Sequence, residues 1–166
     1  MEFDYIIIGA GSAGCVLANH LSSDVRNRVL LIEAGPDTGA LSLKMPAAVL
    51  SNLTSTRHNW AFQGEPEPGL DGRVIQHDRG KTIGGSSSIN GMVFIRGHAL
   101  DYDGWQQAGC PGWGYADVLP YFKRMETYGG GGDEFRGVGG PLHVHRAEPQ
   151  DPITLAFIKA GQEAGY

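Results

Sequence analysis

Three glycines near the amino terminus, Gly9, Gly11 and Gly14, have the GxGxxG spacing that lets a backbone loop hold a pyrophosphate. The first glycine permits a tight turn, the second lets phosphate oxygens approach the backbone, and the third lets a helix pack closely on a strand. Free N–H groups at the helix start, together with the helix dipole, attract the phosphates. We therefore predict that this loop, which includes Ser12 and Ala13, binds a dinucleotide.

Glu33, followed by Ala34, comes at the end of the next apolar run, where an acidic side chain can select the nucleotide. Its carboxylate can accept hydrogen bonds from the adenosine ribose hydroxyls, and its charge repels a 2′-phosphate. NADP is therefore disfavoured. FAD and NAD carry the same ADP half, so the first motif leaves both open.

A second glycine-rich stretch, from Gly80 to Gly97, carries a different set of polar groups. Gly84 and Gly85 precede three serines beginning at Ser86, and their amides and hydroxyls form a nest for anionic or carbonyl oxygens. Positive charge comes from Arg79 and Lys81. Further along, an amide and two apolar side chains suit the edge and face of an isoalloxazine ring: Asn90, Met92 and Val93.

Hydrophobic patterning predicts the elements that position these motifs. A continuously apolar strand over 3–8, a helix over 12–21 and a second buried strand over 29–32 form a βαβ unit, which indicates an α/β, Rossmann-like fold. The stretch from 37 to 80 offers few elements, and Ser12 can cap the first helix or contact the ligand. Further predictions are a short helix within 86–96, a helix over 115–125, a mobile glycine loop around 129–132, a strand over 141–145 and a helix over 153–164.

The second stretch, continued to Trp105, resembles the first signature of the glucose-methanol-choline (GMC) oxidoreductase family. It matches through Asn90, Phe94, Gly97 and Asp103. The likeness extends over the whole chain, and residues 1–5 together with Asn59-Trp60 are most similar to the choline-oxidising members. By this resemblance, residues 1–166 are part of one amino-terminal FAD-binding domain that continues beyond the chain end.

The resemblance implies an extended FAD, with its ADP on the βαβ unit and its flavin beneath the second glycine-rich stretch. In some relatives a histidine just before the asparagine is linked covalently to flavin, but Ile89 stands there, so we expect dissociable FAD. The expected cofactor-binding residues are Gly9, Gly11, Ser12, Ala13, Gly14, Glu33, Ala34, Trp60, Arg79, Gly84, Gly85, Ser86, Asn90, Gly91, Met92 and Val93.

The implied reaction is the oxidation of a small-molecule alcohol, for example choline to betaine aldehyde, with hydride transfer to flavin N5. The family's catalytic histidine lies in a carboxyl-terminal part, so we assign no catalytic residue here and expect the 166-residue chain alone to be inactive and poorly stable. Oxygen, a quinone or another acceptor stays open, as does a homo-oligomer. Alternatives are a nicotinamide-dependent dehydrogenase, a nucleotide-binding module without catalysis, and a GMC enzyme for another primary alcohol.

Composition excludes several other classes of function. The formal net charge is -5 and there is no basic stripe, which argues against nucleic acid as a partner. No apolar run reaches the length of a transmembrane helix, and no room is left for a signal peptide before the first strand. With only Cys15 and Cys110, a disulfide framework is not expected, so we expect a cytoplasmic protein, or one peripheral at the inner membrane.

Three groups of side chains admit two interpretations each. Trp60, Trp105 and Trp113 suit a cation cage, but ordinary packing is favoured. His143 and His145 share a strand face, yet no third ligand supports a metal site, so none is predicted. We expect Asp101 and Asp103 to fix the loop after the flavin segment rather than to form a catalytic carboxylate pair.

Overall fold

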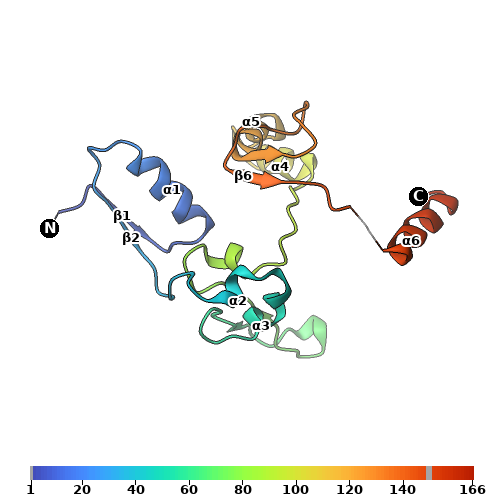
Figure 1. The fold of residues 1–166 in the computed structure, drawn as a ribbon, viewed down its shortest axis with the longest axis horizontal. Helices are drawn as coiled ribbons and strands as arrows, with labels where there is room; N and C mark the ends of the chain where they lie inside the picture. Colours follow the sequence, from blue (N-terminus) through green and yellow to red (C-terminus); the bar gives the residue numbers. More distant parts are fainter. Residues whose placement is uncertain (1, 149–150) are drawn as a thin grey trace. The chain divides into compact units, whose positions relative to one another are not determined.

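The computed structural model describes residues 2–148 and 151–166 of the chain (Figure 1). It divides the chain into two compact units, Met1–Val93 and Phe94–Tyr166.

The first unit opens with the expected strand–helix–strand arrangement. Strand β1 (Tyr5–Ile8) pairs in parallel with β2 (Val29–Ile32), and helix α1 (Ser12–Ser22) lies alongside the pair (Figure 1). Before β1, the main-chain N–H groups of Asp4 and Tyr5 both donate to the carbonyl of Arg28. The βαβ prediction is confirmed, with a first strand shorter at its amino end than expected.

Large apolar side chains of this βαβ unit lie open to solvent. Ile6 is 60% exposed and Ile8 86%, and on α1 Val16 and Leu17 are about half exposed. Within the described ranges, the buried apolar side chains are Ala10 and Ile89. The described residues of the first unit therefore do not cover both faces of this sheet, although the continuous apolar pattern of β1 is typical of strands that are covered on both faces.

The stretch between 37 and 80 contains more short elements than expected. Pro46 and Pro68 occupy first-turn positions of the 3-10 turns η1 (Pro46–Ala48) and η2 (Pro68–Leu70), where a missing N–H costs no hydrogen bond. The short strands β3 and β4 pair antiparallel, with Phe62 opposite His77. The elements are α2 (Leu41–Lys44), η1 (Pro46–Ala48), α3 (Val49–Leu53), β3 (Phe62–Gln63), η2 (Pro68–Leu70) and β4 (Gln76–His77).

The prediction of a helix within 86–96 is wrong. The structure has a single 3-10 turn, η3 (Gly85–Ser88), and no helix from there to His98. The side-chain oxygen of Asn90 accepts from the N–H of Met92 at 3.0 Å, and Met92 has a left-handed φ of +59°. Such a local side-chain turn competes with helical hydrogen bonding, so the backbone leaves the helix here.

In the second unit, helix α4 (Ala99–Gln107) was not predicted, whereas α5 (Tyr115–Met125) has the predicted bounds. A reciprocal capping box between His98 and Asp101 starts α4. Strand β5 (Glu126–Tyr128), also unpredicted, pairs in parallel with β6 (Leu142–Val144). Helix α6 (Pro152–Glu163) is capped by Asp151, close to its predicted position.

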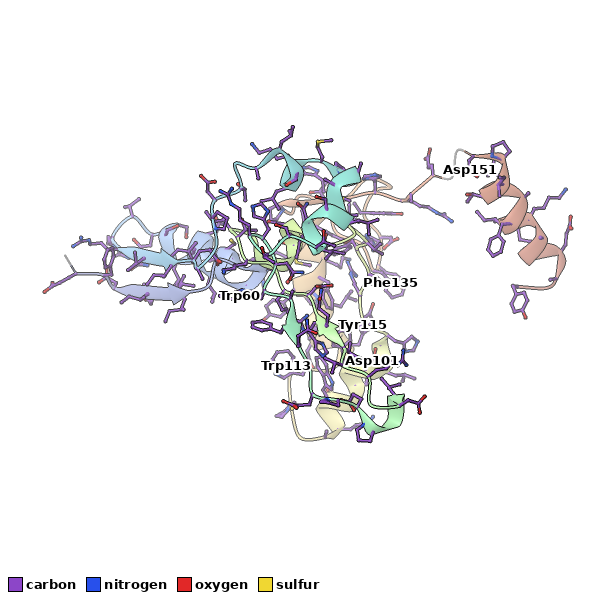
Figure 2. All side chains as sticks on the ribbon, turned by 90° about the horizontal axis from the view of Figure 1, so that it is seen from below. Trp60, Asp101, Trp113, Tyr115, Phe135 and Asp151 are labelled. Atoms are coloured by element: carbon purple, nitrogen blue, oxygen red, sulfur yellow. The ribbon has the colours of Figure 1, made fainter. Side chains whose placement is uncertain are left out.

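The tryptophans and acidic residues around α4 serve packing and capping. The rings of Trp105 and Trp113 meet edge to face at 6.1 Å, and Tyr102 packs against Trp105 at 5.3 Å. Asp101 accepts from the N–H of His98, and Asp103 accepts from the N–H of Tyr115, which starts α5. Figure 2 labels Asp101, Trp113 and Tyr115 in this region. Trp105 and Trp113 pack against neighbouring aromatic rings, as expected, and Asp101 fixes the end of the loop before α4. Asp103 instead lies within α4 and holds the start of α5.

The segment that follows β5 is held by hydrogen bonds and an ion pair of two acidic side chains. Asp133 accepts main-chain N–H groups of Phe135 and Arg136, at 2.7 and 2.6 Å. The fully buried Glu126 accepts the N–H of Gly137 and pairs with Arg96 at 2.8 Å. These contacts fix the backbone on the carboxyl side of residues 129–132, and the mobility expected of that loop stays a prediction.

Candidate dinucleotide site

The first glycine motif has the geometry that its sequence predicts. Gly9 adopts a φ of +96°, which suits the turn after β1. A Cβ placed on Gly14 would collide with the carbonyl of Gly9, so this glycine permits close packing of α1 on the strand. A Cβ on Gly11 would meet nothing within 4 Å, which leaves space above the loop for a ligand.

The start of α1 is open for an anion. Gly11 is the N-cap residue, and no side chain caps the helix. Ser12 is the first helical residue and is exposed, so the expectation that it caps the helix is not met. The first N–H groups of a helix have no intrahelical partner and carry the positive end of its dipole. The loop therefore offers main-chain donors to a phosphate.

Glu33 holds the glycine loop from the end of β2. Its Oε2 accepts the N–H of Ala10 at 2.8 Å, and its Oε1 accepts the N–H of Gly35 at 2.9 Å. A carboxylate has about four lone-pair sites, so two bonds leave capacity for ribose hydroxyls. The residue thus shapes the loop and still fits the predicted nucleotide contact.

The two glycine motifs, far apart in the sequence, meet in the structure. The N–H of Gly84 donates to the carbonyl of Ala10 at 2.6 Å. A Cβ on Gly85 would lie only 2.8 Å from the Cα of Gly11, and Gly85 has a left-handed φ of +55°. Only glycine fits at position 85 for both reasons, close approach and backbone conformation.

Further contacts fasten the second motif to the end of β2. The hydroxyl of Thr82, fully buried, donates to the carbonyl of Pro36 at 2.7 Å. A Cβ on Gly35 would collide with the carbonyl of Lys81, so the segment after β2 and the start of the second motif are in direct contact. Both halves of the predicted site are therefore built into one unit.

The serine hydroxyls are used differently from the expectation. Ser87 and Ser88 donate their hydroxyl hydrogens to the carbonyls of Gly84 and Ile83, at 2.6 and 2.8 Å. Ser86 accepts the N–H of Gly80 at 3.0 Å and keeps its own hydrogen. Two of the three hydroxyls therefore stabilise the turn, and the main chain and Ser86 supply the donors of the nest.

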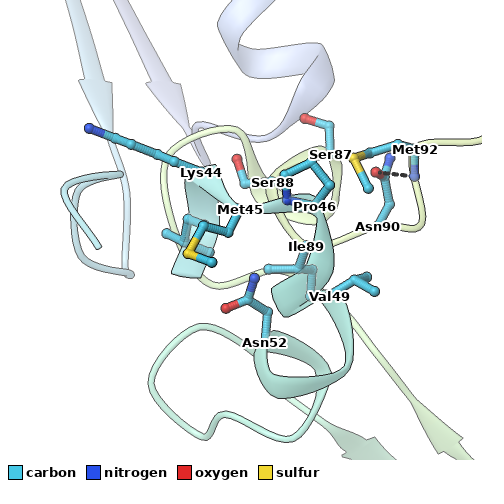
Figure 3. Close-up of a pocket in the computed structure, with 11 residues that line it drawn as sticks. Lys44, Met45, Pro46, Val49, Asn52, Ser87, Ser88, Ile89, Asn90 and Met92 are labelled. Atoms are coloured by element: carbon cyan, nitrogen blue, oxygen red, sulfur yellow. Dashed lines mark hydrogen bonds between the residues drawn. The ribbon is translucent and has the colours of Figure 1, made fainter. Parts of the chain in front are cut away.

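A pocket of about 140 Å³ lies where this segment faces the short helices of the preceding stretch (Figure 3). Asn90 and Met92, both predicted flavin contacts, line it together with η3 residues. The opposite wall was not predicted, because no local motif marks it: it contains Met45, Pro46, Val49 and the buried Asn52. Gly91, between the two predicted contacts, would give a Cβ nothing to meet within 4 Å.

Trp60 lies beside the positively charged start of the second motif. Its ring stacks on Phe62 at 5.7 Å and 7°, and the Lys81 ammonium lies over it at 4.4 Å. The main-chain N–H of Trp60 donates to the carbonyl of Arg79 at 2.9 Å. Because packing and an internal cation already use this ring, the structure favours packing over a substrate cation cage here as well.

Among the described residues, no group of three or more histidine, cysteine, aspartate or glutamate side chains is arranged to hold a metal, and this includes His143 and His145. Cys15 and Cys110 are both free thiols. Within the same part of the chain, no helix has both the length and the apolar character needed to cross a bilayer.

Comparison with known proteins gives a consistent result. The family model for GMC oxidoreductases matches residues 3–166. The chain is 55% identical to the oxygen-dependent choline dehydrogenase of Sinorhizobium fredii, over all of this chain but only 30% of that protein. It therefore spans less than a third of this relative.

Solved structures agree in fold. Pyridoxine 4-oxidase from Mesorbium loti is 40% identical, with a TM-score of 0.89 over 98% of this chain and 32% of that one. An FAD-dependent oxidoreductase from Chaetomium thermophilum is 31% identical, with a TM-score of 0.82 over 99% of this chain and 30% of that one. The part matched is the Rossmann-like FAD-binding domain, as predicted. The chain belongs to the GMC oxidoreductase family.

Proposed function

We propose that this chain forms the FAD-binding part of an oxidoreductase that acts on the CH–OH group of an alcohol, with choline as the first candidate substrate. The observation that supports this most directly is the contact between the two glycine motifs, Gly84 N–H to Ala10 carbonyl at 2.6 Å. It brings the pyrophosphate-binding loop and the predicted flavin segment into one site. Residues 1–166 would then contribute to a single cofactor-binding domain.

The residues present fit FAD. Gly11 and Gly91 leave open space where any side chain would intrude, and the start of α1 offers uncapped N–H donors. Glu33 keeps lone pairs for a ribose and carries a charge that disfavours a 2′-phosphate. Asn90 and Met92 line the adjoining pocket. In the proposed assignment, the first group holds the ADP half and the second contacts the flavin.

The bound flavin would supply the hydride acceptor for alcohol oxidation. The role of this chain is to hold that cofactor and to shape one wall of its surroundings. We assign no catalytic base to it. Of its six histidines, His58 is buried beside Ser55, His98 caps α4, and His77 lies in β4.

Two substrate classes deserve a direct comparison. Several relatives that are 51–55% identical are named oxygen-dependent choline dehydrogenases, which favours choline. The structural neighbour with a TM-score of 0.89 is named pyridoxine 4-oxidase, which makes a heteroaromatic alcohol the second candidate. The Lys81 ammonium over Trp60 favours a packing role for this ring over recognition of a quaternary ammonium.

The test uses the complete gene product. It is purified, its visible flavin absorption is recorded, and choline, pyridoxine or ethanol is added without oxygen. Bleaching by choline is expected. Bleaching by pyridoxine but not choline would reassign the substrate, whereas a colourless protein that refuses added FAD would overturn the proposal and favour a nicotinamide-dependent enzyme. A yellow protein that none of the three alcohols bleaches would favour a binding module without catalysis.

A further inference from the structure

Asn59 is a buried amide at the junction of three chain segments, with only 3% of its surface exposed. Its Nδ2 donates to the carbonyl of Leu53 at 2.6 Å and to Oδ1 of Asp78 at 2.7 Å. Its Oδ1 accepts the main-chain N–H groups of Ala61 and Arg79, both at 3.0 Å.

These four bonds use the whole capacity of a carboxamide. The side chain of an asparagine has two N–H hydrogens and a carbonyl oxygen with two lone pairs. The two partners of its oxygen are main-chain donors and the two partners of its nitrogen are acceptors, so the orientation of the amide is unambiguous. Neither aspartate, which lacks donors, nor leucine, which lacks both, can replace it.

The bonds fix two residues that the sequence assigns to the cofactor. Arg79 is held through its main-chain N–H by Asn59, and through its carbonyl by the N–H of Trp60 at 2.9 Å. Just after Trp60, Ala61 takes a left-handed φ of +45°, which is unfavourable for a residue with a Cβ. The bond from its N–H to Asn59 stabilises that turn and so directs the Trp60 ring.

The same junction reaches the second glycine motif. The N–H of Lys81 donates to the carbonyl of His58 at 2.8 Å, and its ammonium lies over the Trp60 ring at 4.4 Å. The Asn59 backbone also bridges to Gly80. Asn59 and its two chain neighbours therefore contact Arg79, Gly80 and Lys81, where the second glycine-rich stretch begins.

We propose that Asn59, with Asp78 as its partner, is a positioning residue of the cofactor site, which fixes Trp60 and Arg79 and contacts no cofactor itself. This inference rests on the proposed function, since the residues positioned are the predicted FAD contacts. It goes further by assigning to Asn59 and Asp78 a role in cofactor binding that the sequence motifs alone do not give them.

The hydrogen bond between Asn59 and Asp78 can be tested with variants that change its donor, its acceptor or both. Hydrogen bonds from Asn59 and Gln76 lower the pKa of Asp78, so it is an anion at neutral pH. Asn59→Asp removes both donors and places a carboxylate against that anion. Asp78→Asn keeps the accepting oxygen and removes only the charge. The double exchange, Asn59→Asp with Asp78→Asn, restores a donor between the two positions.

FAD affinity and the visible spectrum of the bound flavin are measured on the complete gene product, with unfolding of the apoprotein as a separate readout. Asn59→Asp is expected to weaken FAD binding by about tenfold or more and to change the flavin band shape. Asp78→Asn should stay near wild type, and the double exchange should recover part of the loss. Asp78→Ala, at a partly exposed site, tests the same contact with little risk to folding and should weaken binding by a smaller factor.

Asn27→Asp is the matched control, because the Nδ2 of Asn27 also donates to a main-chain carbonyl, that of Leu21 at 2.9 Å, away from the site. It should lose stability without altering FAD affinity or the spectrum. Wild-type affinity and spectrum in both Asn59→Asp and Asp78→Ala would overturn the inference, as would an affinity loss that merely follows the loss of stability across all variants. Failure of the wild-type protein to bind FAD would instead overturn the proposed function.

Discussion

The N–H of Gly84 donates to the carbonyl of Ala10 across 2.6 Å, which joins the two glycine motifs of this chain into a single surface. The residues on either side make the same connection. Position 85 has no space for a Cβ against Gly11, and Thr82 is bonded to the chain that follows β2. A cofactor that contacts one motif therefore lies within reach of the other.

Gly85→Ala tests the contact between the motifs. The new Cβ would lie 2.8 Å from Gly11 Cα on a backbone with a φ of +55°, so we expect a loss of roughly 1–3 kcal/mol in unfolding free energy together with weaker FAD binding. Denaturant unfolding and FAD titration of the complete gene product measure both. Gly69→Ala, where a Cβ meets nothing within 4 Å, serves as the control and should change neither.

Thr82→Val removes the buried hydroxyl that binds Pro36 while it keeps the shape of the side chain. The carbonyl of Pro36 then loses a 2.7 Å hydrogen bond, and we expect a decrease of about 1–3 kcal/mol in unfolding free energy. Thr54→Val alters an exposed threonine at the C-cap of α3 and should cost less than about 0.5 kcal/mol. Equal decreases in unfolding free energy for the two substitutions would show that the buried bond contributes no more to stability than the exposed one.

The FAD is expected to be dissociable. Ile89, which is 3% exposed, offers no nucleophile at the position where some relatives carry a histidine. Acid precipitation of the holoprotein should release all of the flavin into the supernatant. Yellow colour retained in a washed, denatured pellet would reveal a covalent bond at another residue.

Asp133 should make the glycine loop sensitive to acid. Hydrogen bonds from the N–H groups of Phe135 and Arg136 lower the pKa of this carboxyl in the folded protein. Its stabilising effect is therefore fully present above its ordinary pKa of about 4 and is lost as the pH falls through the lowered folded value. Hydrogen exchange at the two amides should show protection at pH 7 that Asp133→Asn reduces, whereas Asp117→Asn, in the first turn of α5, should not.

The 166-residue chain on its own is expected to be poorly stable and inactive. Ile6 and Ile8 of β1 are 60% and 86% exposed, and exposed apolar strands of this kind favour aggregation. We expect binding of a hydrophobic dye and a broad thermal transition. A sharp cooperative transition without dye binding, or turnover of any alcohol with an artificial electron acceptor, would contradict this.

Features that depend on neighbouring residues were predictable from the sequence. Apolar runs and glycine spacing predict β1, α1 and β2, and the helix over 115–125 is found with the same bounds. Prediction failed where a side chain decides the local backbone. Asn90 turns the chain at Met92 where a helix was expected, and the His98–Asp101 capping box starts a helix whose weak apolar pattern gives little indication of it.

The sequence by itself determined the dinucleotide loop, the flavin signature and the family to which both are similar. Only the tertiary structure decided that Gly11 meets Gly85, that Asn52 lines the pocket and that Asn59 holds Trp60 and Arg79 together. The physical reason is the distance along the chain over which each kind of interaction acts. Backbone propensity and periodicity act over a few residues along the chain, whereas a close approach between distant segments, or four hydrogen bonds on one buried amide, exists only once the chain has packed.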